Sequence, residues 1–197
     1  MSSTESARYT KTAVTLHWLI ALAIIGMLIL GWSFDDFAPE NKAAAFMWHK
    51  SIGICILLLS LTRLGWRLTH RAPAYSEGMP KWQQYAAHGV HFLLYTLMIA
   101  MPFSGWAMSS AGGHPVVMFG IFPWPDVPVL AALDNHKAIA HTIDQFHKSA
   151  ALVLAFLVGG HAAAALWHHF FDRDDILLRI APKPLAGLLN RLRGGLE

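Results

Sequence analysis

Residues 147–171 read HKSAALVLAFLVGGHAAAALWHHFF. From Ser149 to Phe171 the segment contains no Asp, Glu, Lys or Arg, and it exceeds the ~20 apolar residues that a helix needs to cross a bilayer. A helix is expected because backbone polar groups in hydrocarbon must be satisfied within the segment. His147 directly precedes the apolar run and His161 lies deep inside it. Since ionisable side chains are costly in a membrane, these histidines are candidates for a functional role.

Three further apolar stretches precede this one in the chain. Thr12–Phe34 and Trp82–Gly113 contain no charged residue, and Ala43–Thr62 contains only Lys50. Only 14% of the 197 residues are charged, compared with about 25% in soluble domains. We therefore predict an all-α fold, an integral membrane four-helix bundle in a single domain of residues 1–197. Its helices are expected at about 12–32, 44–66, 82–108 and 144–171.

The basic residues predict the orientation of this bundle. Four spans place both termini on one side, and most of the 15 Lys and Arg residues fall on that side. These are Arg8, Lys11, Arg63, Arg67, Arg71, Lys81, Arg173, Arg179, Lys183, Arg191 and Arg193, against Lys42, Lys50, Lys137 and Lys148 on the other. Cytoplasmic loops carry the excess of basic residues, so both termini are expected in the cytoplasm. The basic charge is thus a topology signal and needs no nucleic acid as a partner.

The longest predicted connection, Ser109–Ile143, contains four prolines together with Phe122 and Trp124. It is too apolar for a disordered linker. We expect it to fold back as a lid on the outer membrane surface.

The histidine spacing suggests two sites at different depths. His147 and His161 are 14 residues apart, close to four helical turns, so they share one helix face about 21 Å apart. His17 opens the first helix and is expected level with His161. His49 opens the second helix and is expected level with His147. Helical periodicity therefore predicts two imidazole pairs, one toward each membrane surface.

Facing imidazoles in a helix bundle are the ligands that a six-coordinate haem iron needs. Two histidines per level are too few for a closed zinc site. Cys55 is the only cysteine, which excludes an intrachain disulfide, a Cys-ligated iron–sulfur cluster and a C-x-x-C-H haem attachment. Small residues near the pairs would leave room for a flat macrocycle, although such residues also mediate ordinary helix packing in lipid. These are Gly26, Gly31, Gly53, Gly159, Gly160 and Ala162–Ala165.

Several segments resemble the bacterial cytochrome b561 family, and the resemblance covers nearly the whole chain. They are TLHWL (15–19), WHKSIG (48–53), RLGWR (63–67), GGHAAAALWHH (159–169) and DDILLRIAP (174–182). The resemblance implies a four-helix cytochrome with two haem b groups in the bacterial inner membrane. It also implies axial iron ligands at His17, His49, His147 and His161, in agreement with the levels expected from helical periodicity. One branch of the family acts as a superoxide oxidase, passing electrons from superoxide to ubiquinone.

The expected function is therefore electron transfer from a periplasmic one-electron donor to ubiquinone, which is an exchangeable acceptor. The electrons pass through the outer haem and then the inner haem, and superoxide is the favoured donor. The alternative is a non-enzymatic cytochrome b subunit that links quinone to a separate dehydrogenase or hydrogenase. A third possible class is a histidine-lined transporter. Purified protein that keeps its fold without haem would favour this class.

Charged residues near the two levels have both functional and ordinary interpretations. Lys50 and Lys148 follow the outer histidines, where they would pair haem propionates or attract an anionic donor; they would otherwise snorkel to the interface. Arg63 and Arg67 would bind inner-haem propionates or merely anchor the second helix.

Three further histidines lie in the predicted helices. His168, two turns after His161, is a candidate to hydrogen-bond a quinone carbonyl; otherwise it is an interfacial residue. His88 and His91 have no expected partner at their level, and we interpret them as polar packing or part of the quinone region.

Overall fold

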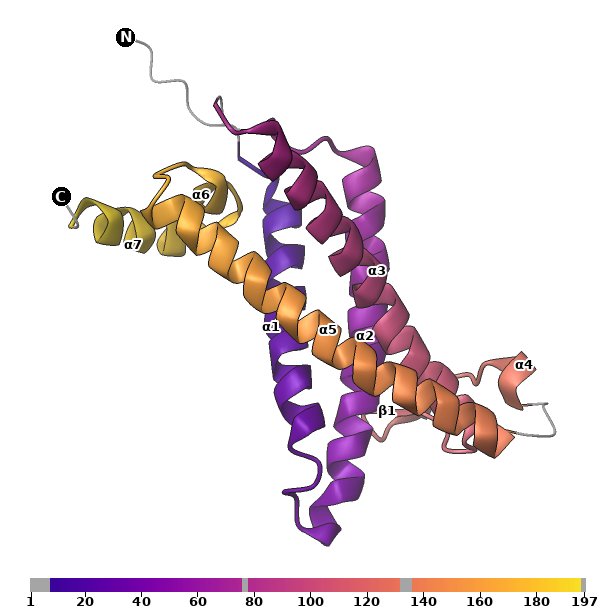
Figure 1. Ribbon diagram of the computed structural model, residues 1–197. Helices are drawn as coiled ribbons and strands as arrows, with labels where there is room; N and C mark the ends of the chain where they lie inside the picture. Colours follow the sequence, from indigo (N-terminus) through magenta and orange to yellow (C-terminus); the bar gives the residue numbers. More distant parts are fainter. Residues whose placement is uncertain (1–7, 76–77, 132–135, 196–197) are drawn as a thin grey trace.

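The computed structural model describes residues 8–75, 78–131 and 136–195. Its main elements are four long helices: α1 (Lys11–Trp32), α2 (Pro39–Thr69), α3 (Lys81–Ala111) and α5 (His136–Phe170) (Figure 1). Each is long and apolar enough to cross a membrane. The predicted all-α fold with four membrane-spanning helices is therefore confirmed.

Two helices begin earlier than predicted. α2 begins at Pro39 instead of Ala44, and a proline suits the first helical turn because its missing N–H needs no partner there. α5 begins at His136 instead of Asp144, since residues 136–143 contain no Gly or Pro that would end a helix. His49 and His147 consequently lie well inside their helices and do not open them.

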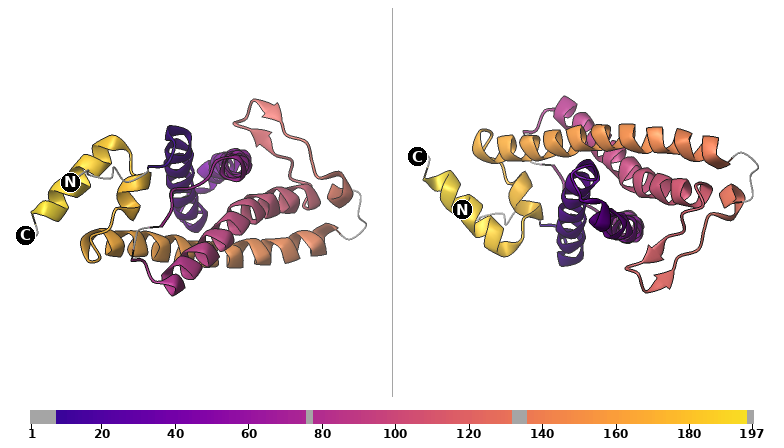
Figure 2. Two further views of the ribbon diagram at one scale, coloured as in Figure 1. Left: turned by 90° about the horizontal axis from the view of Figure 1, so that it is seen from above. Right: turned by 90° about the horizontal axis from the view of Figure 1, so that it is seen from below.

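The helices are not all parallel. α1 begins and α5 ends at what we call the terminal end of the bundle, and the opposite end is called the hairpin end. α3 packs along both α2 and α5, and α1 packs against α2. α5 runs obliquely to α1 and α2 (Figures 1 and 2), and its close backbone contacts with these two helices are sparse in the described chain.

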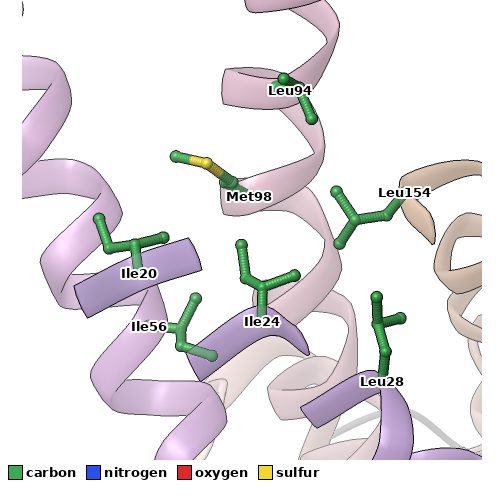
Figure 3. Close-up of a cluster of buried hydrophobic side chains, with 7 residues drawn as sticks. All are labelled: Ile20, Ile24, Leu28, Ile56, Leu94, Met98 and Leu154. Atoms are coloured by element: carbon green, nitrogen blue, oxygen red, sulfur yellow. The ribbon is translucent and has the colours of Figure 1, made fainter. Parts of the chain in front are cut away.

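An apolar core fills the middle of the bundle (Figure 3). It consists of Ile20, Ile24 and Leu28 from α1, Ile56 from α2, Leu94 and Met98 from α3, and Leu154 from α5. Leu154 lies midway between His147 and His161 in the sequence, so the core separates the two histidine levels. Large apolar side chains such as Leu22, Phe92 and Phe156 point outward and are 64–81% exposed, as expected for a surface in contact with lipid.

The connection between α3 and α5 is folded. It contains a two-stranded antiparallel hairpin, β1 (Val117–Met118) and β2 (Phe122–Pro123), and the short helix α4 (Pro128–Ala131). Phe119 has a positive φ of 51° and Gly120 one of 74°, which closes the hairpin turn. Residues 109–143 are therefore not the single loop that the sequence predicts. Residues 109–111 belong to α3, residues 136–143 belong to α5, and the part between them contains the hairpin and α4.

The hairpin is fixed to the sides of α2 and α3. Ser51 Oγ accepts a hydrogen bond from the backbone N–H of Phe119 (2.8 Å). Trp106 Nε1 donates to the carbonyl of Pro125 (2.8 Å). Ile54 is buried together with Val116 and Met118 of this connection, so the connection folds back against α2 and α3; that it covers the outer membrane surface stays a prediction.

The C-terminal segment forms α6 (Ile176–Ile180) and α7 (Lys183–Gly194), which sequence analysis did not predict. Trp18 Nε1 donates to the carbonyl of Ile180 (2.9 Å), and Arg8 donates to that of Ala181 (2.6 Å). These bonds hold the segment beside the start of α1, at the terminal end (Figure 1).

Candidate haem-binding sites

The four histidines expected as ligands meet in two pairs. The ring centroids of His17 and His161 lie 6.2 Å apart with an interplanar angle of 78°. Those of His49 and His147 lie 6.3 Å apart at 67°. The first pair joins α1 to α5 toward the terminal end, and the second joins α2 to α5 toward the hairpin end; we call them the inner and outer pairs.

Both separations suit two imidazoles on opposite sides of one metal ion. A metal–imidazole bond of about 2.0–2.1 Å, plus about 1.1 Å from the nitrogen to the ring centre, places collinear ligands roughly 6.2–6.4 Å apart. The rings belong to helices whose backbones make few close contacts with each other. Two imidazoles at this spacing are the donor set of bis-histidine haem iron, so the residues fit the group.

His91 departs from expectation. Its ring lies 5.3 Å from that of His161, closer than the ring of His17, so the prediction that His91 has no partner at its level is wrong. The 5.3 Å separation is too short for collinear ligation by His91 and His161, which favours His17 as the opposing ligand. His88 instead meets Tyr75, with ring centroids 5.5 Å apart.

A serine that sequence analysis missed orients the outer pair. Ser104 Oγ donates its single hydrogen to the carbonyl of Met101 (2.7 Å) and lies 2.8 Å from His147 Nδ1. Because the hydroxyl hydrogen is already used, Nδ1–H must donate to Ser104. The Nε2 atom of His147 is then left with its lone pair, as an iron ligand requires.

Two glycines bring neighbouring helices close to the outer imidazoles. A Cβ atom on Gly105 would lie 3.1 Å from Cε1 of His147, and one on Gly31 would lie 3.4 Å from Cε1 of His49. Nδ1 of His49 is buried without a hydrogen-bond partner among the described residues. This ring can therefore be held in place by packing and by a bond from its nitrogen to a bound group.

The other predicted small residues differ in their surroundings. A Cβ atom on Gly26, Gly159 or Gly160 would meet nothing within 4 Å, and one on Gly53 would reach only the Cε of Met27 at 4.0 Å. Open space beside these glycines is compatible with a flat ligand, but equally with lipid-facing helix surfaces.

The two lysines next to the outer pair have partners within the protein. Lys50 Nζ donates to the carbonyl of His114 (3.0 Å). Lys148 Nζ forms an ion pair with Asp144 (2.7 Å) and is 68% exposed. The charge of Lys148 is thus partly neutralised, and Lys50 holds the segment that follows α3 to α2.

Arg63 reaches from α2 toward the inner pair. It donates to the carbonyl of Ala13 (2.8 Å), and its guanidinium lies 5.9 Å from the ring centre of Tyr95. With Arg67 and Arg71 it lines a small depression at the terminal end. This basic depression suits a carboxylate, in line with the propionate role expected for Arg63 and Arg67.

His168 lies at the end of α5, two turns beyond His161. Its Nδ1 atom contacts carboxylates of Asp174 (2.8 Å) and Asp172 (3.1 Å). Its neighbour His169 is fully buried, with Nε2 3.1 Å from the carbonyl of Leu189, so the two adjacent histidines have different environments.

Comparison with known proteins shows the family to which the chain is related. A family profile described as prokaryotic cytochrome b561 matches residues 8–183. Cytochrome b561 homolog 2 of Escherichia coli (strain K12) is 35% identical over 181 residues, covering 89% of this chain and 92% of the relative. A probable superoxide oxidase CybB of Yersinia pestis is 31% identical over 180 residues, covering 89% and 97%. Cytochrome b562 of Cereibacter sphaeroides is 29% identical, covering 90% and 97%.

Proposed function

Because this chain belongs to the prokaryotic cytochrome b561 family, whose members are haem b electron-transfer proteins of the membrane, we propose that it carries two haem b groups. His17 and His161 hold the inner one, and His49 and His147 the outer one. The observation that carries this proposal is the matching ring separation of 6.2 and 6.3 Å in the two pairs. When bound, the haems supply one-electron carriers at two depths of the bilayer.

The protein's own residues position and insulate these sites. Ser104 fixes the tautomer of His147, and the apolar core around Leu154 keeps water from the space between the two levels. Arg63 and Arg67 pair with propionates at the inner site. Lys50 and Lys148 add positive charge at the outer site, where Lys148 is open to solution.

We further propose that the chain is a superoxide:ubiquinone oxidoreductase of the bacterial inner membrane, with both termini in the cytoplasm. Two superoxide ions lose one electron each on the periplasmic side, and one ubiquinone takes up both electrons and two protons to give ubiquinol and two O₂. This is supported by the relative named as a probable superoxide oxidase.

The test uses the purified full-length protein in detergent with a soluble ubiquinone analogue. Superoxide is generated at a constant rate, and its decay and quinol formation are followed together. We expect consumption well above spontaneous dismutation, with two superoxide ions lost per quinol formed. A His49→Ala/His147→Ala variant should lose this activity, whereas a His141→Ala variant, changed at an exposed position of α5, should retain it.

A protein with two haems that leaves superoxide decay unchanged would contradict the proposed substrate. Co-purification with an iron–sulfur dehydrogenase would then support the alternative, an electron-transfer subunit between that enzyme and quinone.

A further inference from the structure

α7 has two apolar sides, and the rest of the described chain covers only one of them. Ala186 and Leu189 are buried in a cluster with residues of α6. Leu188 and Leu192 are instead 53% and 52% exposed. Because residues four apart lie on the same face of a helix, these two leucines form one uncovered apolar stripe along α7.

Hydrogen bonds and an ion pair fix the position of α7. The ring Nε2 atom of His169, in the last turn of α5, lies 3.1 Å from the carbonyl oxygen of Leu189. Arg193 lies 3.6 Å from a carboxylate oxygen of Asp175 and donates to the carbonyl of Asp174 (3.2 Å). Both the middle and the end of α7 are therefore attached to α5 and to the turn after it, so the leucine stripe cannot turn inward without breaking these contacts.

α7 lies across the bundle at its terminal end. In Figure 1 it extends sideways beside the start of α1, and from above, in Figure 2, α2 is seen almost along its axis whereas α7 is seen from its side. α7 has 12 residues, a length of about 18 Å, which is too short to cross the hydrocarbon core of a bilayer. An amphipathic helix in this orientation lies in the plane of the membrane surface.

The end of α5 marks the level of this surface. Trp167 and Phe171 stack with ring centroids 4.3 Å apart, and both side chains are more than half exposed. Exposed tryptophan is characteristic of the boundary between hydrocarbon and lipid headgroups. His169, which contacts α7, lies between these two residues in the sequence, so α7 is attached at the depth of that boundary.

The charges of α7 are all positive. The helix contains Lys183, Arg191 and Arg193 and no Asp or Glu. Arg193 is paired with Asp175, whereas Lys183 and Arg191 are exposed and have no hydrogen-bond or ion-pair partner among the described residues. Arg191 follows Leu188 by three residues, so it lies beside the apolar stripe. The phosphates of lipid headgroups complement this combination of leucines and basic residues.

We propose that α7 is an interfacial helix that binds anionic phospholipids at the membrane surface on the terminal side. Leu188 and Leu192 enter the boundary of the acyl chains, Arg191 binds a lipid phosphate, and Lys183 adds positive charge at the start of the helix. The binding requires neither haem nor quinone; only its assignment to the cytoplasmic leaflet rests on the orientation proposed above. Anionic lipids give that leaflet a negative surface potential, which attracts a basic helix.

A second copy of the chain is the main alternative occupant of the leucine stripe. Pairing two α7 helices through Leu188 and Leu192 would bring the Arg191 side chains of both copies close together. Like charges that face each other across an interface oppose association, whereas a layer of anionic phosphates compensates them. Charge complementarity therefore favours the lipid surface.

The first experiment measures the depth of α7 in vesicles of phosphatidylcholine and phosphatidylglycerol. The full-length protein carries Cys55→Ser and one spin-labelled cysteine, introduced by Leu188→Cys, Leu192→Cys or Asn190→Cys. Asn190 is exposed and is the matched control, because a residue two positions away points to the opposite side of a helix. Power saturation compares collisions of each label with oxygen, which concentrates in hydrocarbon, and with a water-soluble nickel chelate.

We expect the labels at positions 188 and 192 to collide mainly with oxygen and the label at position 190 mainly with the nickel chelate. Nickel access to all three labels would show that α7 stays in water and would overturn the proposal. Labels at positions 188 and 192 that neither reagent reaches would show that protein covers the stripe, which would overturn it as well.

The second experiment tests the lipid class by native mass spectrometry of the full-length protein in detergent with added phosphatidylglycerol. The variant Lys183→Gln/Arg191→Gln is compared with a matched control, Lys42→Gln/Lys137→Gln, which removes the same charge near the hairpin end. We expect the Kd for phosphatidylglycerol to rise about tenfold in the first variant and to stay unchanged in the control. Binding of phosphatidylcholine should be the same in all three proteins.

An equal loss of affinity in both charge variants, or no loss in either, would overturn the role of α7 in binding anionic lipid. Circular dichroism checks that each variant keeps the helical content of the wild type, and if the α7 variant does not fold, the depth measurement decides the question. Protein without haem that still shows both expected results would leave this inference intact while contradicting the proposed function.

Discussion

Ser104 and His147 are 43 residues apart in the sequence, yet the serine hydroxyl oxygen lies 2.8 Å from the imidazole Nδ1. Replacing the serine by alanine removes the hydrogen bond that sets the tautomer and angle of the outer ligand. Second-sphere changes of this kind cost about 10–100-fold in metal affinity. We expect Ser104→Ala to weaken haem binding at the outer site, measured by haem retention during dilution.

The control for this variant is Ser60→Ala. Ser60 is also a buried serine, but its hydroxyl has no partner among the described residues, so both haems should be retained. Equal haem loss in the two variants would show that the hydrogen bond to His147 has no special role.

The histidine pairs predict which substitutions remove the same haem. Wild-type protein should contain two haems per chain, and His17→Ala or His161→Ala should each lose the inner one. His91→Ala should keep both, because its 5.3 Å distance from His161 is too short for collinear ligation. The measurement is haem quantitation with a reduced-minus-oxidised spectrum, and loss of a haem from His91→Ala but not from His17→Ala would reverse the assignment.

The ring orientations predict a spectroscopic signature. The imidazole planes are inclined at 78° in the inner pair and 67° in the outer pair. Near-perpendicular axial planes keep two iron d orbitals close in energy, so low-temperature electron paramagnetic resonance of the oxidised protein should show strongly anisotropic low-spin signals. Rhombic spectra typical of near-parallel ligands would mean that the rings rotate when haem binds.

Gly105→Ala tests how tightly α3 approaches the outer site. The added Cβ would lie 3.1 Å from His147 Cε1, and relieving such overpacking costs about 1–3 kcal/mol. We expect a shifted outer-haem potential or loss of that haem in a redox titration. Gly26→Ala, which meets nothing within 4 Å, should titrate like the wild type; two unchanged titrations would indicate that His147 moves freely.

The proposed topology can be tested with reporter fusions in a bacterial host. A fluorescent protein fused after the last residue should fluoresce, and alkaline phosphatase fused there should be inactive, because the terminal end is expected in the cytoplasm. The same reporters fused after Gly113, at the hairpin end, should behave in the opposite way. The reverse pattern would invert the direction of electron flow proposed above.

Sequence reasoning predicted the pairing of His17 with His161 and of His49 with His147, because in a regular helix the residue number determines the depth in the membrane. The error at His91 arose because α3 was not matched in depth to α5. The role of Ser104 could not be predicted for a similar reason, because it depends on how one turn of α3 packs against α5. Asp172 and Asp174 depend on the left-handed conformation of Arg173, which no local pattern signals for an arginine.

The sequence analysis also did not predict the full length of α5 or the presence of the hairpin. Four prolines between residues 109 and 143 suggested an irregular connection, whereas they fall within the middle of that segment and leave the helices on both sides intact. The bonds of Ser51 and Trp106 to the hairpin join distant parts of the chain.

The apolar layer around Leu154 has an energetic consequence. Its buried side chains are all aliphatic or Met, which favours electron transfer between the two levels without accompanying protons. In the proposed orientation, negative charge moves inward and protons are consumed on the cytoplasmic face, so each turnover is electrogenic and charges the membrane. Moving one charge through 100 mV corresponds to about 2.3 kcal/mol. In sealed proteoliposomes a voltage-sensitive dye should report an interior-negative potential when superoxide is supplied outside, and its absence during quinone reduction would mean that both half-reactions use the same face.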